Sequence, residues 1–182
     1  MLVLDVPEIE LFDEAKEEFF KVKKTELRLE HSLVSIAKWE SKWKKPFLSP
    51  IKNDKTPAEM LDYIRCMTVS QNVDPNVYYA LSTEDFCRIN EYIDDPMTAT
   101  TFNDFGTHTP TREVVTAELV YYMMFSYQIP MECQKWHFNR LMTLIRVFNV
   151  KNSTQKKMPK SEVLARNRSL NAARRAAAHT KG

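Results

Sequence analysis

The stretch SLVSIAKWESKWKKP, residues 32–46, shows the clearest helical pattern in the chain. Its apolar side chains, which include Trp39 and Trp43, fall on one face of a helix, and its lysines fall on the opposite face. Pro46 closes the pattern, because the residue before a proline avoids the α conformation. We therefore expect an amphipathic helix that packs its apolar face on a core.

Trp39 and Trp43 have two interpretations. Aromatic rings among lysines are typical of grooves that bind nucleic acid. On this helix, however, the rings and the lysines face opposite ways, whereas base stacking and phosphate contacts need one shared surface. Core packing is the favoured interpretation, and a partner-binding aromatic patch formed by Trp39 and Trp43 is the alternative.

The segments that precede this helix favour β-structure. Residues 2–6 fit a short strand, and residues 25–30 alternate in the period of a half-buried strand, with Leu27 and Leu29 on one face. Residues 9–22 suit either a helix or a hairpin. We favour two strands that flank a short polar connection.

The segments that follow the helix favour further helices. Thr56-Pro57 supplies an N-cap with proline at the first helical position, and Ser82 with Asp85 resembles a capping box. Thr109-Pro110 is the expected cap of a later helix. The expected helical ranges are 57–67, 74–81, 83–93, 111–127 and 131–150.

The helices expected over 111–127 and 131–150 are predicted to form the centre of the core. Residues 119–125 are apolar all round, which is typical of a helix buried on most sides. Leu141, Leu144, Ile145 and Phe148 form an inward stripe on the last body helix. The predicted fold is mainly α with α+β character. A small N-terminal β element packs on a bundle of about five helices, and a basic C-terminal helical arm follows.

Charge divides the chain near residue 150. Residues 151–182 hold nine basic residues and one acid, a net +8; since the whole chain carries +2, residues 1–150 carry −6. We therefore expect an acidic globular body, residues 1–150, and a basic arm, residues 151–182. Blocks of like charge usually act as interaction arms.

Four arginines of the arm are candidate binding residues. They are Arg166, Arg168, Arg174 and Arg175. On a helix they do not form a single stripe, so a solvated tail, a protein contact and a nucleic-acid contact all stay open. The acidic body would not attract nucleic acid, and phosphate binding by the arm would weaken steeply with salt.

Composition argues against an enzyme and against a cofactor. The only glycines are Gly106 and Gly182, whereas phosphate-binding loops and nucleophile elbows need glycine at fixed positions. Cys133 and His137 could share a helix face, but zinc needs three or four ligands, so a packed core Cys/His pair is favoured over a metal site. His31 and His108 are expected in turns or at the surface.

Compartment and membrane contact follow from the cysteines and the apolar runs. The three cysteines are widely spaced and favour free thiols in a reducing cytosol. The longest apolar run has seven residues, far fewer than a bilayer needs. The N-terminus lacks the pattern of a secretory signal. We expect no membrane contact.

Several stretches together resemble the tail assembly chaperones encoded in the structural-gene cassettes of tailed bacteriophages. The matching stretches are LRLEHSLVSIAKWESKWKKPFL (27–48), TPAEMLDYIRCM (56–67), INEYIDDPMTATTF (89–102), CQKWHFNRLMTLIRVFNVKN (133–152) and ARNRSLNAARRAAAHTKG (165–182).

The resemblance implies a non-enzymatic protein that escorts the tape-measure protein, a long helical chain, in the host cytoplasm. A virion subunit of the tail or neck is the alternative, and a nucleic-acid-binding regulator is a third candidate. The sequence leaves self-association open.

Overall fold

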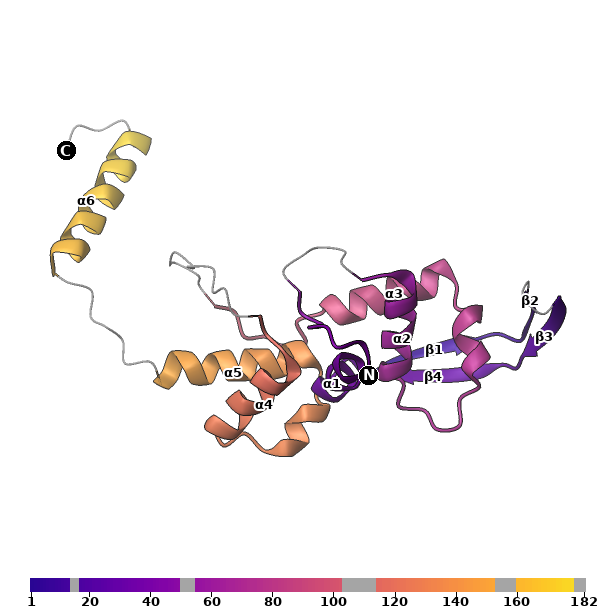
Figure 1. The fold of residues 1–182 in the computed structure, drawn as a ribbon. Helices are drawn as coiled ribbons and strands as arrows, with labels where there is room; N and C mark the ends of the chain where they lie inside the picture. Colours follow the sequence, from indigo (N-terminus) through magenta and orange to yellow (C-terminus); the bar gives the residue numbers. More distant parts are fainter. Residues whose placement is uncertain (14–16, 50–54, 103–113, 153–159, 179–182) are drawn as a thin grey trace. The chain divides into compact units, whose positions relative to one another are not determined.

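The computed structural model describes residues 1–182 apart from 14–16, 50–54, 103–113, 153–159 and 179–182. The chain divides into two units, residues 1–148 and residues 149–182. Each unit is described by itself (Figure 1). The chain is mainly α-helical, with a small β element at the N-terminus.

The β element consists of two antiparallel ladders. One ladder pairs β1 with β4, and the other pairs β2 with β3. The strand bounds are β1 Leu2–Val6, β2 Ile9–Asp13, β3 Glu18–Val22 and β4 Thr25–Leu29. The strands predicted at 2–6 and 25–30 are confirmed, and the hairpin is the correct alternative for residues 9–22.

Both ladders belong to one nested hairpin (Figure 1). Val6 lies opposite Thr25 and Ile9 lies opposite Val22, so the register is the same on both sides of a short interruption. Pro7 lies in that interruption, where a residue without a backbone N–H costs no ladder hydrogen bond. The side chains of β1 and β4 alternate between buried and exposed, as in a half-buried strand pair.

Three α-helices begin where the sequence predicts, and two of them begin at the predicted caps, Thr56 and Ser82. Their bounds are α1 Leu33–Trp43, α2 Pro57–Met67 and α3 Thr83–Asp94, and their N-caps are Ser32, Thr56 and Ser82. Thr56 and Ser82 each form a capping box with the acid three residues later. The helix predicted at 74–81 is a tighter 3-10 helix, η1 Pro75–Ala80, preceded by Asp74, whose side chain accepts from Asn76 N.

The helix predicted over 111–127 begins later than expected. Its bounds are α4 Ala117–Ser126. The expected cap, Thr109-Pro110, lies outside the described residues. Thr116 is the cap, and the Ala117 N–H donates to Glu40 Oε2 at 2.8 Å. A carboxylate of α1 therefore helps to fix where this helix starts.

The prediction that residues 119–125 are buried on most sides is wrong. Val120 and Met124 are fully buried, whereas Tyr122 and Phe125 are 67% and 66% exposed. Apolar composition does not by itself say which face of a helix meets the core, and α4 meets it with one face.

The continuous helix predicted over 131–150 is interrupted. A 3-10 helix, η2 Met131–Lys135, precedes α5 Phe138–Asn152. Between them His137 forms an isolated β-bridge with Ser32, and the Phe138 N–H donates to the carbonyl of His31 at 2.7 Å. This long-range pairing extends the backbone at His137. The predicted inward stripe includes the buried Leu141 and Ile145.

The core is centred on the β element, α1 and α2. The prediction that the helices corresponding to α4 and α5 form its centre is wrong. Most of the largest fully buried side chains belong to β1, β4, α1 and α2. These are Leu4, Leu27, Leu29, Leu33, Ile36, Trp39, Tyr63, Ile64 and Met67.

The second unit contains α6, Lys160–Ala177. The side chains described from Leu164 to Ala178 are all exposed. Among the helices of the described ranges, none has both the length and the apolar character of a membrane span.

Candidate functional site

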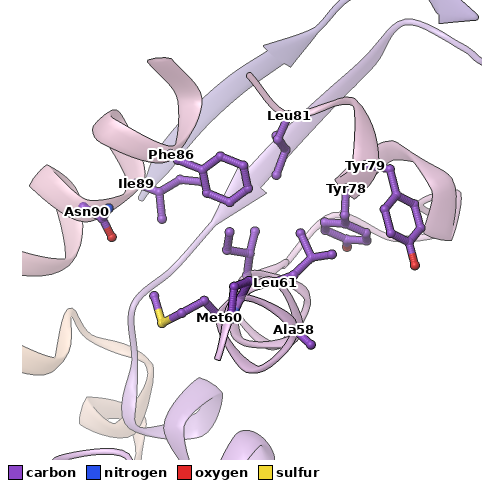
Figure 2. A pocket seen from close by; sticks show the side chains of 11 residues that line it. Ala58, Met60, Leu61, Tyr78, Tyr79, Leu81, Phe86, Ile89 and Asn90 are labelled. Carbon is purple, nitrogen blue, oxygen red and sulfur yellow. The ribbon is translucent and has the colours of Figure 1, made fainter. Parts of the chain in front are cut away.

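An apolar groove lies between α2, η1 and α3. Its volume is about 520 Å³. In Figure 2 the side chains of α2 and α3 form opposite walls, and Tyr78 and Tyr79 of η1 lie at one end. We call this feature the α2–α3 groove. The residues that line it are Pro57, Ala58, Met60, Leu61, Ile64, Tyr78, Tyr79, Leu81, Phe86, Ile89 and Asn90.

The α2 wall of the groove is fixed to α1 through Glu59. The Trp39 Nε1–H donates to the Glu59 carbonyl at 2.8 Å, and Lys45 Nζ donates to Glu59 Oε1 at 2.6 Å. The Thr56 N–H donates to Glu59 Oε2 at 2.7 Å. The hydrogen bond from Lys45, followed by that from the Thr56 backbone, lowers the pKa of Glu59. These bonds position the first turn of α2.

The α3 wall is fixed to the β element and to the segment that follows β4. The Tyr92 Oη–H donates to Glu30 Oε1 at 2.6 Å, and Arg88 Nη2 donates to the Val3 carbonyl at 3.2 Å. Burial, followed by this hydrogen bond to Glu30, raises the pKa of Tyr92. Since both walls are held by contacts outside the groove, the groove is preformed.

Two tyrosines with different exposure close one end of the groove. Tyr78 is buried, and its hydroxyl donates to Thr68 Oγ1 at 2.9 Å, while Tyr79 is 59% exposed. The Arg65 guanidinium carbon lies 5.3 Å from the centre of the Tyr78 ring and 5.5 Å from that of Tyr79. These are cation–π distances.

The lining of the groove suits apolar side chains. Methionine and aromatic side chains adapt to differently shaped partners, and Met60, Leu61 and Phe86 are partly exposed here. Apart from the two tyrosine hydroxyls, the polar side chain in the lining is that of Asn90. Such a groove can take the apolar face of a helix.

The predicted binding residues Trp39 and Trp43 do not line the groove. Trp39 is 1% exposed, and Trp43 is half-buried. The Trp43 Nε1–H donates to Asp62 Oδ2 at 2.9 Å, and Lys42 pairs with the same carboxylate. Trp39 thus packs in the core and links α1 to α2, as the favoured interpretation expects.

The four predicted arginines of the arm, Arg166, Arg168, Arg174 and Arg175, all lie on α6 and are exposed. They do not form one stripe along that helix. Their described geometry fits a solvated face as well as a contact surface.

The histidines and cysteines do not form a metal site in the described part of the chain. Cys133 and His137 are buried, but they lie on either side of the break between η2 and α5, and no described cluster of three or more ligating groups is present. His108 lies outside the described residues.

The prediction that His31 lies in a turn or at the surface is wrong. The residue is 2% exposed, its Nδ1 lies 2.5 Å from Tyr63 Oη, and its ring centre lies 5.1 Å from that of His137. Burial, followed by the proximity of His137, lowers the pKa of His31 to about 3. His31 is therefore a neutral core residue at neutral pH.

The exposed apolar side chains of the first unit include two pairs outside the groove. Phe12 and Phe19 form a cross-strand pair at 4.9 Å on β2 and β3, and Tyr122 and Phe125 lie on α4. Neither pair lines the groove.

The sequence carried one signal for the groove itself: α2 has the apolar residues Ala58 and Leu61 in addition to its buried face of Tyr63, Ile64 and Met67.

No family model, no curated protein and no solved structure matches the chain.

Proposed function

We propose that this chain is a non-enzymatic binding protein whose α2–α3 groove receives the apolar face of a helix from a partner protein. One observation carries the proposal: an open apolar groove of about 520 Å³ stands between two walls that are fixed from outside it. A preformed groove binds without the cost of ordering its own walls.

The resemblance to tail assembly chaperones supplies the partner. It implies that the bound helix belongs to the tape-measure protein of a tailed phage and that binding takes place in the host cytoplasm. A long amphipathic chain exposes apolar faces before tube subunits surround it. A groove that covers such a face would keep the chain from aggregating.

A direct test compares two exposed tyrosines. Tyr79→Ala removes a side chain that lines the groove and is 59% exposed, whereas Tyr122→Ala removes one on α4 that is 67% exposed. Because both side chains are largely exposed, both variants should fold. We expect Tyr79→Ala to weaken binding of a helical tape-measure fragment about tenfold or more, as for an aromatic contact residue, and Tyr122→Ala to leave it unchanged. The reverse result would move the site to α4.

A second candidate function is that of a virion subunit that uses the basic arm. The observation in its favour is that Arg166, Arg168, Arg174 and Arg175 are all exposed on α6. Fractionation of purified particles separates the candidates, because a chaperone is absent from mature virions and a subunit is present at fixed copy number. Changing the four arginines to glutamine then tests whether the arm contacts protein or DNA. For DNA, the logarithm of the affinity would fall linearly with the logarithm of the salt concentration.

A further inference from the structure

We infer that the helix received by the α2–α3 groove carries an acidic side chain beside its apolar face, and that this side chain pairs with Arg65. The inference rests on the proposed function and adds the charge of the partner. It is carried by the position of Arg65, by the lack of a carboxylate partner for it among the described residues, and by its contacts with two tyrosine rings.

Arg65 lies at the edge of the groove. It comes one helical turn after Leu61, which lines the groove, so the two side chains are neighbours on the surface of α2. Its guanidinium approaches Tyr78 and Tyr79, which close one end of the groove. A helix that fills the groove therefore passes next to this cation.

The other charged groups of α2 are already paired. Glu59 accepts from Lys45, and Asp62 accepts from Lys42. Arg65, in contrast, has no ion pair with a carboxylate in the described part of the chain, and its Nε has no hydrogen-bond acceptor there. The groove thus has a cation at its edge whose charge no described carboxylate balances.

The contacts of Arg65 suit it to a carboxylate. The side chain is half-buried, and the rings of Tyr78 and Tyr79 limit the conformations of the guanidinium. A planar guanidinium forms paired hydrogen bonds with a carboxylate, and it loses less entropy when its position is already restricted. A partner helix with glutamate or aspartate at the flank of its apolar stripe matches both the groove and its edge.

The test uses three synthetic helical peptides that share one leucine stripe and differ only at the flanking positions, which hold Glu, Gln or Lys. Binding to the full chain is measured by fluorescence anisotropy at low and moderate salt. We expect the Glu peptide to bind about tenfold more tightly than the Lys peptide, with the Gln peptide between them and a smaller difference at the higher salt.

Variants at Arg65 assign the preference to this residue. Arg65→Gln should level the three affinities, and Arg65→Glu should reverse their order, provided that circular dichroism shows both variants folded. Arg140→Gln is the matched control, because the Arg140 guanidinium also lies over an aromatic ring, that of Trp136, at 4.4 Å, and Arg140 does not line the groove. It should leave the order unchanged.

Four results would overturn the inference. Equal binding of the three peptides, all weakened by Tyr79→Ala, would remove the acidic preference and leave the proposed groove standing. If none of the peptides binds, or if Tyr79→Ala leaves their binding unchanged, the groove is not a helix-binding site and the proposed function is wrong as well. Tightest binding by a peptide of residues 160–178 would identify the basic arm of another copy as the occupant.

Discussion

Helices α2 and α6 form for different reasons. The shorter, α2, has 11 residues, begins at a capping box and buries Tyr63, Ile64 and Met67. The longer, α6, has 18 residues rich in alanine and arginine, and its described side chains are exposed. Packing stabilises α2, whereas α6 depends on intrinsic helix propensity. A preformed groove needs walls that are held in place by packing, and this is why the groove belongs to the first unit.

The largest effect expected from this difference is at Trp39. Trp39→Ala should lower the free energy of unfolding by about 3–5 kcal/mol, because it removes a large buried aromatic side chain and leaves a cavity. Leu170→Ala on α6 is the counterpart, and since Leu170 is 46% exposed it should change stability by less than about 0.5 kcal/mol. Urea unfolding followed by fluorescence measures both. A Trp39→Ala variant that stays stable but fails to bind its partner would show that Trp39 belongs to a binding surface.

The buried His31 makes the stability of the first unit depend on pH. Its pKa is about 3 in the folded chain and about 6.5 when unfolded, so below pH 6.5 the unfolded state binds the extra proton. Stability is therefore fully present above pH 6.5 and falls as the pH is lowered toward 3. The loss between pH 6.5 and pH 5 should be about 2 kcal/mol.

Urea unfolding at pH 7, 6 and 5 checks this slope. His31→Gln removes the titrating group and keeps a polar side chain that can hydrogen-bond Tyr63. The variant should show a shallower dependence on pH than the wild type. An unchanged slope would assign the pH dependence to other groups.

Local signals predicted the starts of the first three α-helices correctly. Ser32, Thr56 and Ser82 each accept a backbone N–H within their own helix, so their role depends on a few neighbouring residues. The strands predicted at residues 2–6 and 25–30 were equally readable, the second from its alternation, because these signals lie within each strand.

Long-range contacts explain what the sequence did not show. The start of α4 at Ala117 involves Glu40, and the break before α5 involves the pairing of His137 with Ser32. The burial of His31 depends on Tyr63, which is distant in sequence. The groove itself combines faces of α2, η1 and α3, and no single segment carries its pattern.

A smaller effect is expected at the cap of α2. Thr56→Ala should destabilise the first unit by about 1 kcal/mol, because the side chain that accepts the Glu59 N–H is lost. Thr83→Ala is the matched control: Thr83 is the first residue of α3 and lies next to the cap instead of forming it. Its effect should stay below about 0.5 kcal/mol. Equal losses at the two positions in thermal melts would show that the Thr56 cap has no special role.

The smallest effect is expected from removing the arm. α5 ends at Asn152, and the described side chains of residues 164–178 are exposed, so a chain that ends at Asn152 loses little buried surface. Its melting temperature should stay within about 2 °C of that of the full chain, since about 1 kcal/mol corresponds to 2–4 °C at this size. Peptide binding to the groove should also be retained, because Tyr79, Arg65 and the walls that hold them all precede the cut. A broad, low-temperature transition would show instead that the arm packs on the first unit and stabilises it, and the contrast between the two helices would no longer hold.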